Sequence, residues 1–434
     1  MPWAGSDKRS RLKQLRRGDS EPPLRCPDLF LASTPLSASA DHGRETRLLL
    51  LGRGIRAFVD GYVAVLLPAY LLALGLEPVH VGLLSTATLL GSALMTLLVG
   101  AWGHRLHGAH LLRTAAIVMT LTGLAFASLS DFWPLAVVAF VGTLNPSSGD
   151  VSVFLPLEHA RLAHAAEGDQ RTRLFARYSL MGAVCAAVGS LAVAVPEHWS
   201  RSGIEQLDAM RFMFGAYAAA GVLIWLLYRK LPGPDQTVSQ PAGGLGKSRP
   251  IVVKLAMLFS VDAFAGGLLV QSLLALWLFK RLDLSLAAAG SFFFWAGLLT
   301  ALSQLAAPWI ARRIGLLNTM VFTHIPSSIA LIGAAYAPTL ELALGLLLLR
   351  SLLSQMDVPT RSAYVMSVVS PPERVAAAGF TLVPRSLAAA LSPSLSGAML
   401  AAGHLAAPLL LCGTLKIAYD LVLLAVFRRV EPVE

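Results

Sequence analysis

The stretch 342–361, LALGLLLLRSLLSQMDVPTR, decides the fold, because charged residues follow an apolar run without a turn signal. On a helix with about 100° per residue, one stripe about 60° wide carries Arg350, Ser354, Asp357 and Arg361. A charge at the bilayer centre costs about 2.5–3.5 kcal/mol, while each leucine returns about 0.3–0.6 kcal/mol. Such a helix is stable in a membrane only if its stripe faces other helices or a water-filled cavity, which is typical of a permeation path.

The whole chain has the composition of a protein with many membrane spans. Its 434 residues are 55% hydrophobic and 14% charged, against about 25% charged residues in soluble domains. The net charge of +10 fits the excess of Lys and Arg in cytoplasmic loops better than it fits nucleic-acid binding. Cys26, Cys185 and Cys412 are far apart and lack metal-ligand spacing, so neither a disulfide framework nor a metal site is predicted.

Apolar segments of about 20 residues, the length that crosses a bilayer, recur along the chain. They predict an all-α membrane protein with twelve transmembrane helices. The predicted spans lie at about 48–75, 79–101, 111–130, 134–158, 172–195, 211–229, 251–279, 285–309, 316–336, 340–368, 375–402 and 406–428.

A Pro-, Gly- and Ser-rich stretch between the sixth and seventh spans indicates a linker between two six-helix bundles. Lys and Arg gather in the loops that are cytoplasmic if both termini lie inside, and this bias predicts cytoplasmic termini. The predicted domains are a disordered basic cytoplasmic tail at 1–45, an N-terminal bundle at 46–229, a cytoplasmic linker at 230–250, a C-terminal bundle at 251–428 and a tail at 429–434.

The two halves also repeat polar residues at matching positions. Three pairs recur at offsets of 202, 207 and 208: Asp60 and Asp262, Asp150 and Asp357, Arg177 and Arg385. Internal duplication of this kind is typical of transporters, whose binding site lies where the repeats meet.

Two pseudo-symmetric six-helix halves, an internal linker and cytoplasmic termini together resemble the major facilitator superfamily. The resemblance covers about residues 46–430. The superfamily's loop motif between the second and third spans, Gly-x-x-x-Asp-Arg-x-Gly, has a degenerate counterpart at residues 100–108. The first glycine and Arg105 are kept, His104 stands at the position of the acid, and the second glycine is displaced by one. The matching loop after the eighth span, which contains Arg313, also lacks the acid.

The resemblance implies that the first, fourth, seventh and tenth spans line a central cavity. Each of these spans carries one aspartate: Asp60, Asp150, Asp262 and Asp357. A carboxylate shielded from bulk water can exchange a proton in the physiological range. These acids are therefore candidates for proton coupling or substrate binding. The alternative is that each is locked in a structural ion pair.

Three arginines are further candidates for coupling or substrate binding. Arg56 either pairs with Asp60, four residues later on the same helix, or holds an anionic substrate through a bidentate contact. Arg350 and Arg361 stand on the polar stripe of the tenth span, where Arg361 either serves the site or forms a static pair with Asp357.

A cytoplasmic gate is the role that we predict for Arg177 and Arg385, together with Arg105 and Arg313 in the two related loops. Arg177 and Arg385 are expected at the same depth as the acids of the fourth and tenth spans, on the order of 10–15 Å below the surface. Ion pairs across the halves would then close the cavity.

Other polar residues are given structural roles. Lys416 and Asp420, four residues apart in the last span, are expected to neutralise each other outside the cavity. His324 is expected to satisfy a local hydrogen bond. Residues 104–110 carry three histidines without a fourth ligand, so we expect a solvated loop rather than a metal site.

Together these features predict a secondary active transporter that moves a small organic solute by alternating access, coupled to protons or another ion, in a direction left open. The alternative is a non-transporting membrane receptor or assembly partner with the same fold. No nucleophile elbow, metal-binding helix or phosphate loop occurs in the sequence, so neither an enzyme nor a cofactor is expected. We expect a monomer in the lipid bilayer of the plasma membrane, of the bacterial inner-membrane type, with no nucleic-acid partner.

Overall fold

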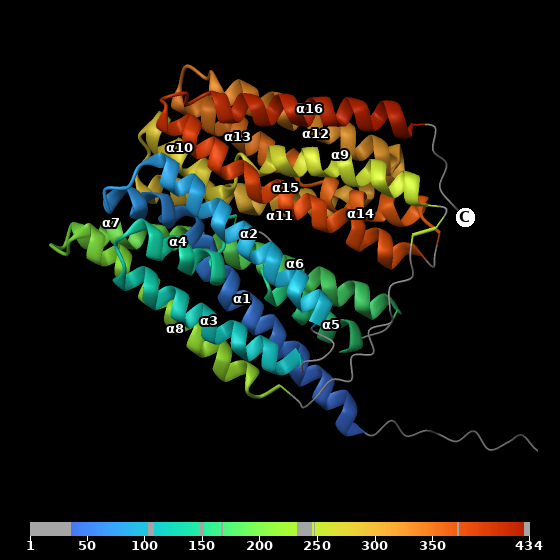
Figure 1. Cartoon of the computed structure of the whole chain (residues 1–434), viewed down its shortest axis with the longest axis horizontal. Coiled ribbons are helices and arrows are strands. Elements are labelled where there is room, and N and C mark those ends of the chain that lie inside the picture. Colours follow the sequence, from blue (N-terminus) through green and yellow to red (C-terminus); the bar gives the residue numbers. More distant parts are fainter. Residues whose placement is uncertain are drawn as a thin grey trace, which may run out of the picture. The chain divides into compact units, whose positions relative to one another are not determined.

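The computed structural model describes residues 36–102, 108–147, 152–165, 168–231, 245–246, 248–370 and 373–428. Every regular element in these ranges is a helix (Figure 1). Residues 42–434 form one compact unit. Asp150 and Arg105, which we expected in the cavity and the gate, lie outside the described residues.

The first half of the chain supplies the first six predicted spans. Its helices are α1 (Leu36–Ala73), α2 (Pro78–Trp102), α3 (Gly108–Ser128), α4 (Phe132–Val141), α5 (Phe154–Ala165), α6 (Gly168–Leu191), the 3-10 helix η3 (Ala192–Ala194), α7 (Val195–Ser200) and α8 (Gln206–Tyr228).

The second half supplies the other six. Its helices are α9 (Arg249–Gly267), α10 (Gln271–Leu282), α11 (Leu286–Ile314), α12 (Leu316–Ala335), α13 (Leu340–Ser354), α14 (Asp357–Val368), α15 (Arg374–Ala401) and α16 (Ala407–Phe427).

Ten segments of the described chain are helical, long and apolar enough to cross a membrane, and each coincides with a predicted span. The other two predicted spans are helical as well. The span at 134–158 is divided between α4 and α5, and the span at 375–402 corresponds to α15, which is 28 residues long. The chain is therefore an all-helical, multi-pass membrane protein, consistent with twelve spans. The domain limits at residues 45, 229, 250 and 428 stay a prediction.

Breaks interrupt the fourth, seventh and tenth spans, between α4 and α5, α9 and α10, and α13 and α14. The expectation of one continuous helix over the tenth span is wrong, because Gln355 and Met356 form a turn. Pro359 lies in the first turn of α14, where a missing N–H removes no helical hydrogen bond, so a helix can restart there. Broken helices are tolerated at membrane depth only where protein or a water-filled cavity surrounds them. The breaks therefore favour an interior position for these three spans.

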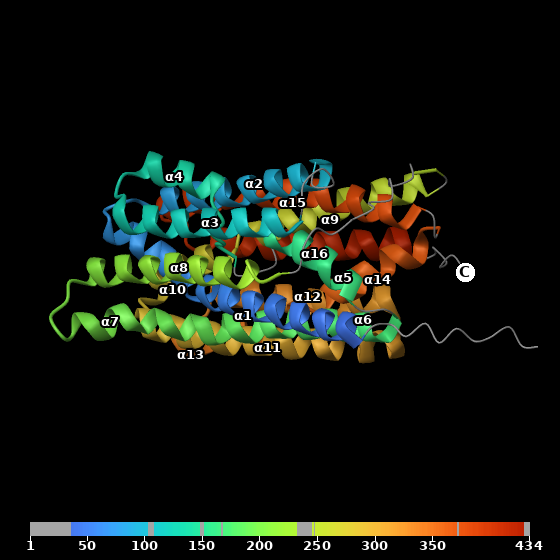
Figure 2. The ribbon, with the colours of Figure 1, turned by 90° about the horizontal axis from the view of Figure 1, so that it is seen from below.

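The main contacts between the two halves are those of two helix pairs, α2 with α15 and α6 with α11 (Figures 1 and 2). Small residues allow the close approach of α2 and α15. A Cβ atom on Gly82 would lie 2.5 Å from the carbonyl oxygen of Pro393 and 2.8 Å from the Cα atom of Gly397. Because backbone meets backbone here, any larger residue at Gly82 would push the halves apart.

Candidate functional site

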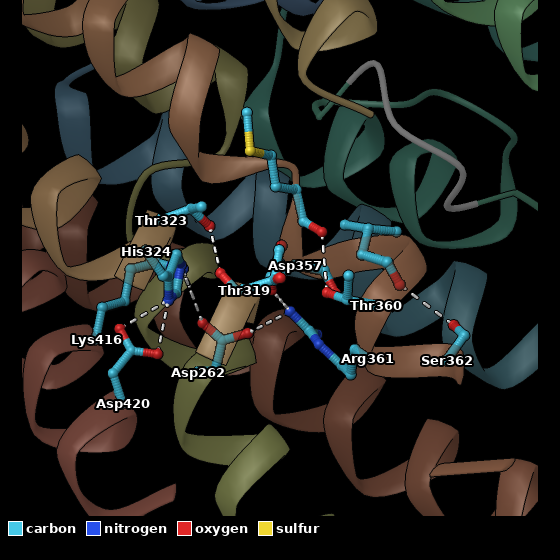
Figure 3. Close-up of polar contacts among 12 residues, drawn as sticks. Asp262, Thr319, Thr323, His324, Asp357, Thr360, Arg361, Ser362, Lys416 and Asp420 are labelled. Atoms are coloured by element: carbon cyan, nitrogen blue, oxygen red, sulfur yellow. Dashed lines mark hydrogen bonds and ion pairs between the residues drawn. The ribbon is translucent and has the colours of Figure 1, made fainter. Parts of the chain in front are cut away.

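Six titratable side chains from four helices meet in the C-terminal half (Figure 3). This C-terminal cluster consists of Asp262 on α9, His324 on α12, Asp357 and Arg361 on α14, and Lys416 and Asp420 on α16. Five of the six are buried, and Lys416 is partly buried. Since an unpaired buried charge costs several kcal/mol, the contacts inside the cluster decide whether these residues are tolerated.

Asp262 stands between two cations. Its Oδ1 accepts a hydrogen bond from Lys416 Nζ at 2.8 Å, and its Oδ2 lies 3.0 Å from Arg361 Nη2. The same Nη2 also donates to Asp357, the first residue of α14. The carboxylate of Asp262 is thus shared by α14 and α16, and neutralising it would weaken the contacts of both helices with α9.

His324 connects Lys416 to Asp420. Its Nδ1 lies 3.1 and 3.0 Å from the two carboxylate oxygens of Asp420, and its Nε2 lies 3.1 Å from Lys416 Nζ. Two expectations are therefore wrong. Lys416 and Asp420 bind His324 from either side instead of each other, and His324 bonds across helices rather than locally. The physical reason is that α9 and α12 bring partners closer to these side chains than the next turn of α16 does.

Two further arginines lie around the C-terminal cluster. Arg350 on α13 interacts electrostatically with His324, and Arg385 on α15 interacts with Arg361 and Asp262. The turn before α14 places Arg350 and Arg361 on different helices, and both interact electrostatically with His324. Within the described chain, Nε and Nη1 of Arg361 are buried without a hydrogen-bond partner.

A second buried network lies in the N-terminal half and is built around Glu158 of α5. Arg56 on α1 donates to its Oε1 at 2.6 Å and to its Oε2 at 2.8 Å. The hydroxyls of Tyr178 on α6 and Tyr228 on α8 donate to the same carboxylate. Each oxygen of Glu158 thus accepts two hydrogen bonds. We call these four residues the N-terminal network. Sequence reasoning missed Glu158, which stands at the end of a predicted span and carries no signal of its own.

The expected pairing of Arg56 with Asp60 is wrong. Arg56 turns to Glu158 because a bidentate contact between guanidinium and carboxylate is stronger than a single bond along the helix. Asp60 is only 4% exposed, and its Oδ1 has no hydrogen-bond partner among the described residues. It interacts electrostatically with Arg56 and Arg53. Asp60 is therefore a buried carboxyl whose Oδ1 accepts no hydrogen bond from the described residues.

The predicted gate residues form no ion pair across the halves within the described chain. Arg177 is exposed on α6. Arg313 is exposed near the end of α11 and stacks on Trp309, with its Cζ 4.0 Å from the ring centroid. Arg385 lies beside the C-terminal cluster. The gate therefore stays a prediction.

Comparisons with known proteins agree with this architecture. The family model of the Major Facilitator Superfamily matches residues 49–354. An uncharacterized membrane protein of Saccharomyces cerevisiae is 23% identical over 429 residues, which cover 89% of this chain and 95% of that protein.

Two solved transporters have a similar fold. A D-xylose–proton symporter has a TM-score of 0.70 at 15% identity, over 88% of this chain and 97% of its own. The nucleoside transporter NupG has a TM-score of 0.68 at 15% identity, over 88% of this chain and 99% of its own. At these identities the likeness concerns the fold alone.

Proposed function

Because this chain belongs to the Major Facilitator Superfamily, we propose that it is a secondary active transporter. It moves a small organic solute by alternating access, with protons as the coupling ion. Proteins with the same fold include a D-xylose–proton symporter and a nucleoside transporter, and these names support a small polar organic molecule as the solute.

The observation that carries the proposal is the position of Asp262 between Lys416 and Arg361. A proton on Asp262 removes the negative charge that both cations face. Removing one partner of a buried ion pair costs about 3–5 kcal/mol, because the other charge is left uncompensated. Proton binding therefore weakens the contacts of α9 with α14 and α16. A transporter can couple a proton to helix movement only if the proton changes contacts between helices in this way.

The contacts inside and between the halves support movement of two rigid bodies. The N-terminal network joins α1, α5, α6 and α8, and the C-terminal cluster joins α9, α12, α14 and α16. Between the halves, the described residues form hydrogen bonds and no ion pair. Ser85 Oγ lies 3.1 Å from Ser272 Oγ, Ser190 Oγ donates to the Gly290 carbonyl at 3.2 Å, and the Ala287 N–H donates to the Glu197 carboxylate at 3.0 Å. Glu197 also pairs with Arg201 of its own half, so these contacts can separate without leaving a charge unpaired.

These contacts also support an assignment of the conformation. Ser85, Ser190, Ser272 and Gly290 lie in the parts of their spans that the loop charges place on the side opposite the termini. These contacts therefore support a molecule that is closed on that side. The same loop charges support both termini in the cytoplasm, and a plasma-membrane location is part of the proposal.

Reconstitution in liposomes tests the proposal with a mixture of candidate solutes. Liposomes with and without the protein are exposed to sugars, nucleosides, amino acids and carboxylates, with or without a pH gradient, and their contents are measured by mass spectrometry. We expect at least one solute to accumulate only when both protein and gradient are present. Equal contents in protein-containing and empty liposomes would contradict transport, and accumulation that ignores the gradient would contradict proton coupling.

A further inference from the structure

The hydrogen bonds of His324 determine which of its ring nitrogens carries the proton. An ammonium group has only donors, and Lys416 forms an ion pair with Asp262 through its ammonium group at 2.8 Å. Lys416 Nζ lies 3.1 Å from His324 Nε2, so Nε2 must accept and carries no hydrogen. The proton of the neutral ring is then on Nδ1, where it is donated to Asp420. His324 is therefore a neutral imidazole with a basic nitrogen directed at Lys416 and Asp262.

Charged and titratable groups from several helices surround the His324 ring. Asp262 Oδ1 of α9 lies 3.8 Å from Nε2. Arg350 of α13 and Arg361 of α14 interact with the ring at longer range. The aromatic ring of Tyr419 on α16 lies edge-on, with its centroid 6.3 Å from that of the imidazole. The charged residues of α11 stand exposed at its C-terminal end. One carboxylate thus lies within reach of Nε2 besides the one that already binds Nδ1.

We propose that His324 Nε2 is a proton-binding site, and that a proton bound there takes the place of Lys416 at Asp262. The added proton forms an N–H bond at Nε2, so this nitrogen changes from acceptor to donor and the ring gains one positive charge. Lys416 loses its acceptor and now faces a like charge. The new N–H lies on the side of Nε2 where Lys416 Nζ stood, and Asp262 Oδ1, 3.8 Å from Nε2, becomes its acceptor when Lys416 is released.

This inference rests on the proposed proton coupling and adds His324 Nε2 as a second proton-binding group beside the Asp262 carboxylate. The consequence for the helices is specific. Before protonation, α16 holds α9 through Lys416 and Asp262; afterwards α12 holds α9 through His324 and Asp262. A partner exchange moves the contact from one helix to another without leaving the Asp262 carboxylate unpaired.

Nitrogen NMR of ¹⁵N-histidine-labelled protein in lipid nanodiscs tests the proposal directly and needs no solute. The chain has 10 histidines, so the His324 signal is assigned by its loss in His324→Gln. Asp420→Asn, which keeps an acceptor oxygen and shifts the same signal, is a second assignment variant if the first does not fold. At about pH 7.5 we expect Nδ1 protonated and Nε2 unprotonated, and on acidification toward about pH 5 we expect both nitrogens protonated.

A proton on Nε2 at neutral pH, or a ring that stays neutral on acidification, would overturn the inference. Transport by His324→Gln separates proton binding from a structural role, because glutamine keeps hydrogen bonding but takes up no proton. We expect its uptake to lose the pH dependence of the wild type while solute exchange without a gradient remains. His404→Gln, at an exposed position after α15, is the matched control. If NMR shows Nε2 protonated at neutral pH, or a ring that stays neutral in acid, while gradient-driven accumulation persists, this inference fails and the proposed function stands.

Discussion

The two halves of the chain bury charged groups in different ways. The N-terminal network has one acid and one base, and two tyrosine hydroxyls complete the hydrogen bonds of the acid. The C-terminal cluster has three acids, two permanent cations and an imidazole, which share partners across four helices. We expect the binding of one proton to leave the hydrogen bonds of the N-terminal network unchanged. In the C-terminal cluster we expect it to change which side chains form ion pairs. Under the proposed function, buried charge thus serves stability in one half and partner exchange in the other.

The matching aspartates of the first and seventh spans show the same contrast. Asp262 has two cationic partners within 3.0 Å, whereas Asp60 has a carboxylate oxygen without a hydrogen-bond partner in the described chain. The difference arises because Glu158 takes the arginine that stands four residues before Asp60. We therefore expect Asp262, and not Asp60, to control the contacts between helices.

The largest expected effect concerns the contact between the halves, which lies outside both networks. Ser85→Cys combined with Ser272→Cys places two thiols where hydroxyl oxygens now lie 3.1 Å apart, close enough to form an S–S bond of about 2.05 Å after a small adjustment. Oxidation is expected to abolish transport, and reduction to restore it, because the halves can no longer separate. The measurement is solute uptake by liposomes before and after a reductant.

Each single cysteine variant is the control for this experiment and is expected to transport under both conditions. A double variant that is shown to be cross-linked and yet transports normally would mean that this contact does not open during the cycle.

The next effect concerns the stability of the N-terminal network. Glu158→Ala leaves the guanidinium of Arg56 buried without its partner, and loss of one member of such a pair costs about 3–5 kcal/mol. We expect a large drop in unfolding temperature, measured by differential scanning fluorimetry in detergent.

Glu205→Ala is the matched control. This glutamate is exposed, and although it stands at the N-cap of α8, its side chain accepts no capping hydrogen bond from that helix. If both variants unfold at the same temperature, the N-terminal network is not a stabilising element, and the contrast between the two halves is lost.

The smallest effect is expected at Gly246 and Ser248, which belong to the described part of the predicted linker. Glu373 accepts hydrogen bonds from the N–H groups of Gly246 and Ser248 at 2.9 and 3.1 Å. Hydrogen bonding from the side chain and backbone of Ser248 lowers the pKa of Glu373 below its ordinary value. Its contribution is therefore present above the ordinary pKa of a glutamate and is lost as the pH falls through the lowered pKa.

Amide hydrogen exchange at Gly246 and Ser248 measures this contribution. We expect protection at neutral pH that is reduced in acid, and reduced at neutral pH in Glu373→Gln, with little change in the unfolding temperature. Protection that is the same in wild type and variant at neutral pH would show that Glu373 does not hold the linker.

The spans and the family were predictable because each span buries about 20 apolar residues, a pattern that one sequence displays directly. The spacing of Asp357 and Arg361 also indicated their contact as one alternative, and the structure contains it. Both residues lie on the same helix, so their distance depends on local geometry alone.

Spacing failed where another helix supplied a better partner. Arg56 and Lys416 each stand four residues before an aspartate, yet they bind Glu158 and Asp262. The role of His324 was missed for a related reason, because the last span was expected to lie outside the cavity and only packing brings Lys416 and His324 to Asp262. One sequence contains no information on such distances.

Transport by Asp262→Asn tests the central claim most directly, namely that a proton acts at the carboxylate shared by Lys416 and Arg361. The measurement compares gradient-driven accumulation of the solute with its exchange across liposomes at equal pH on both sides, and uses Asp131→Asn, at an exposed position, as the control. We expect that Asp262→Asn still exchanges the solute but no longer accumulates it, while the control does both. Accumulation by Asp262→Asn at the wild-type level would show that the coupling proton does not act at this carboxylate.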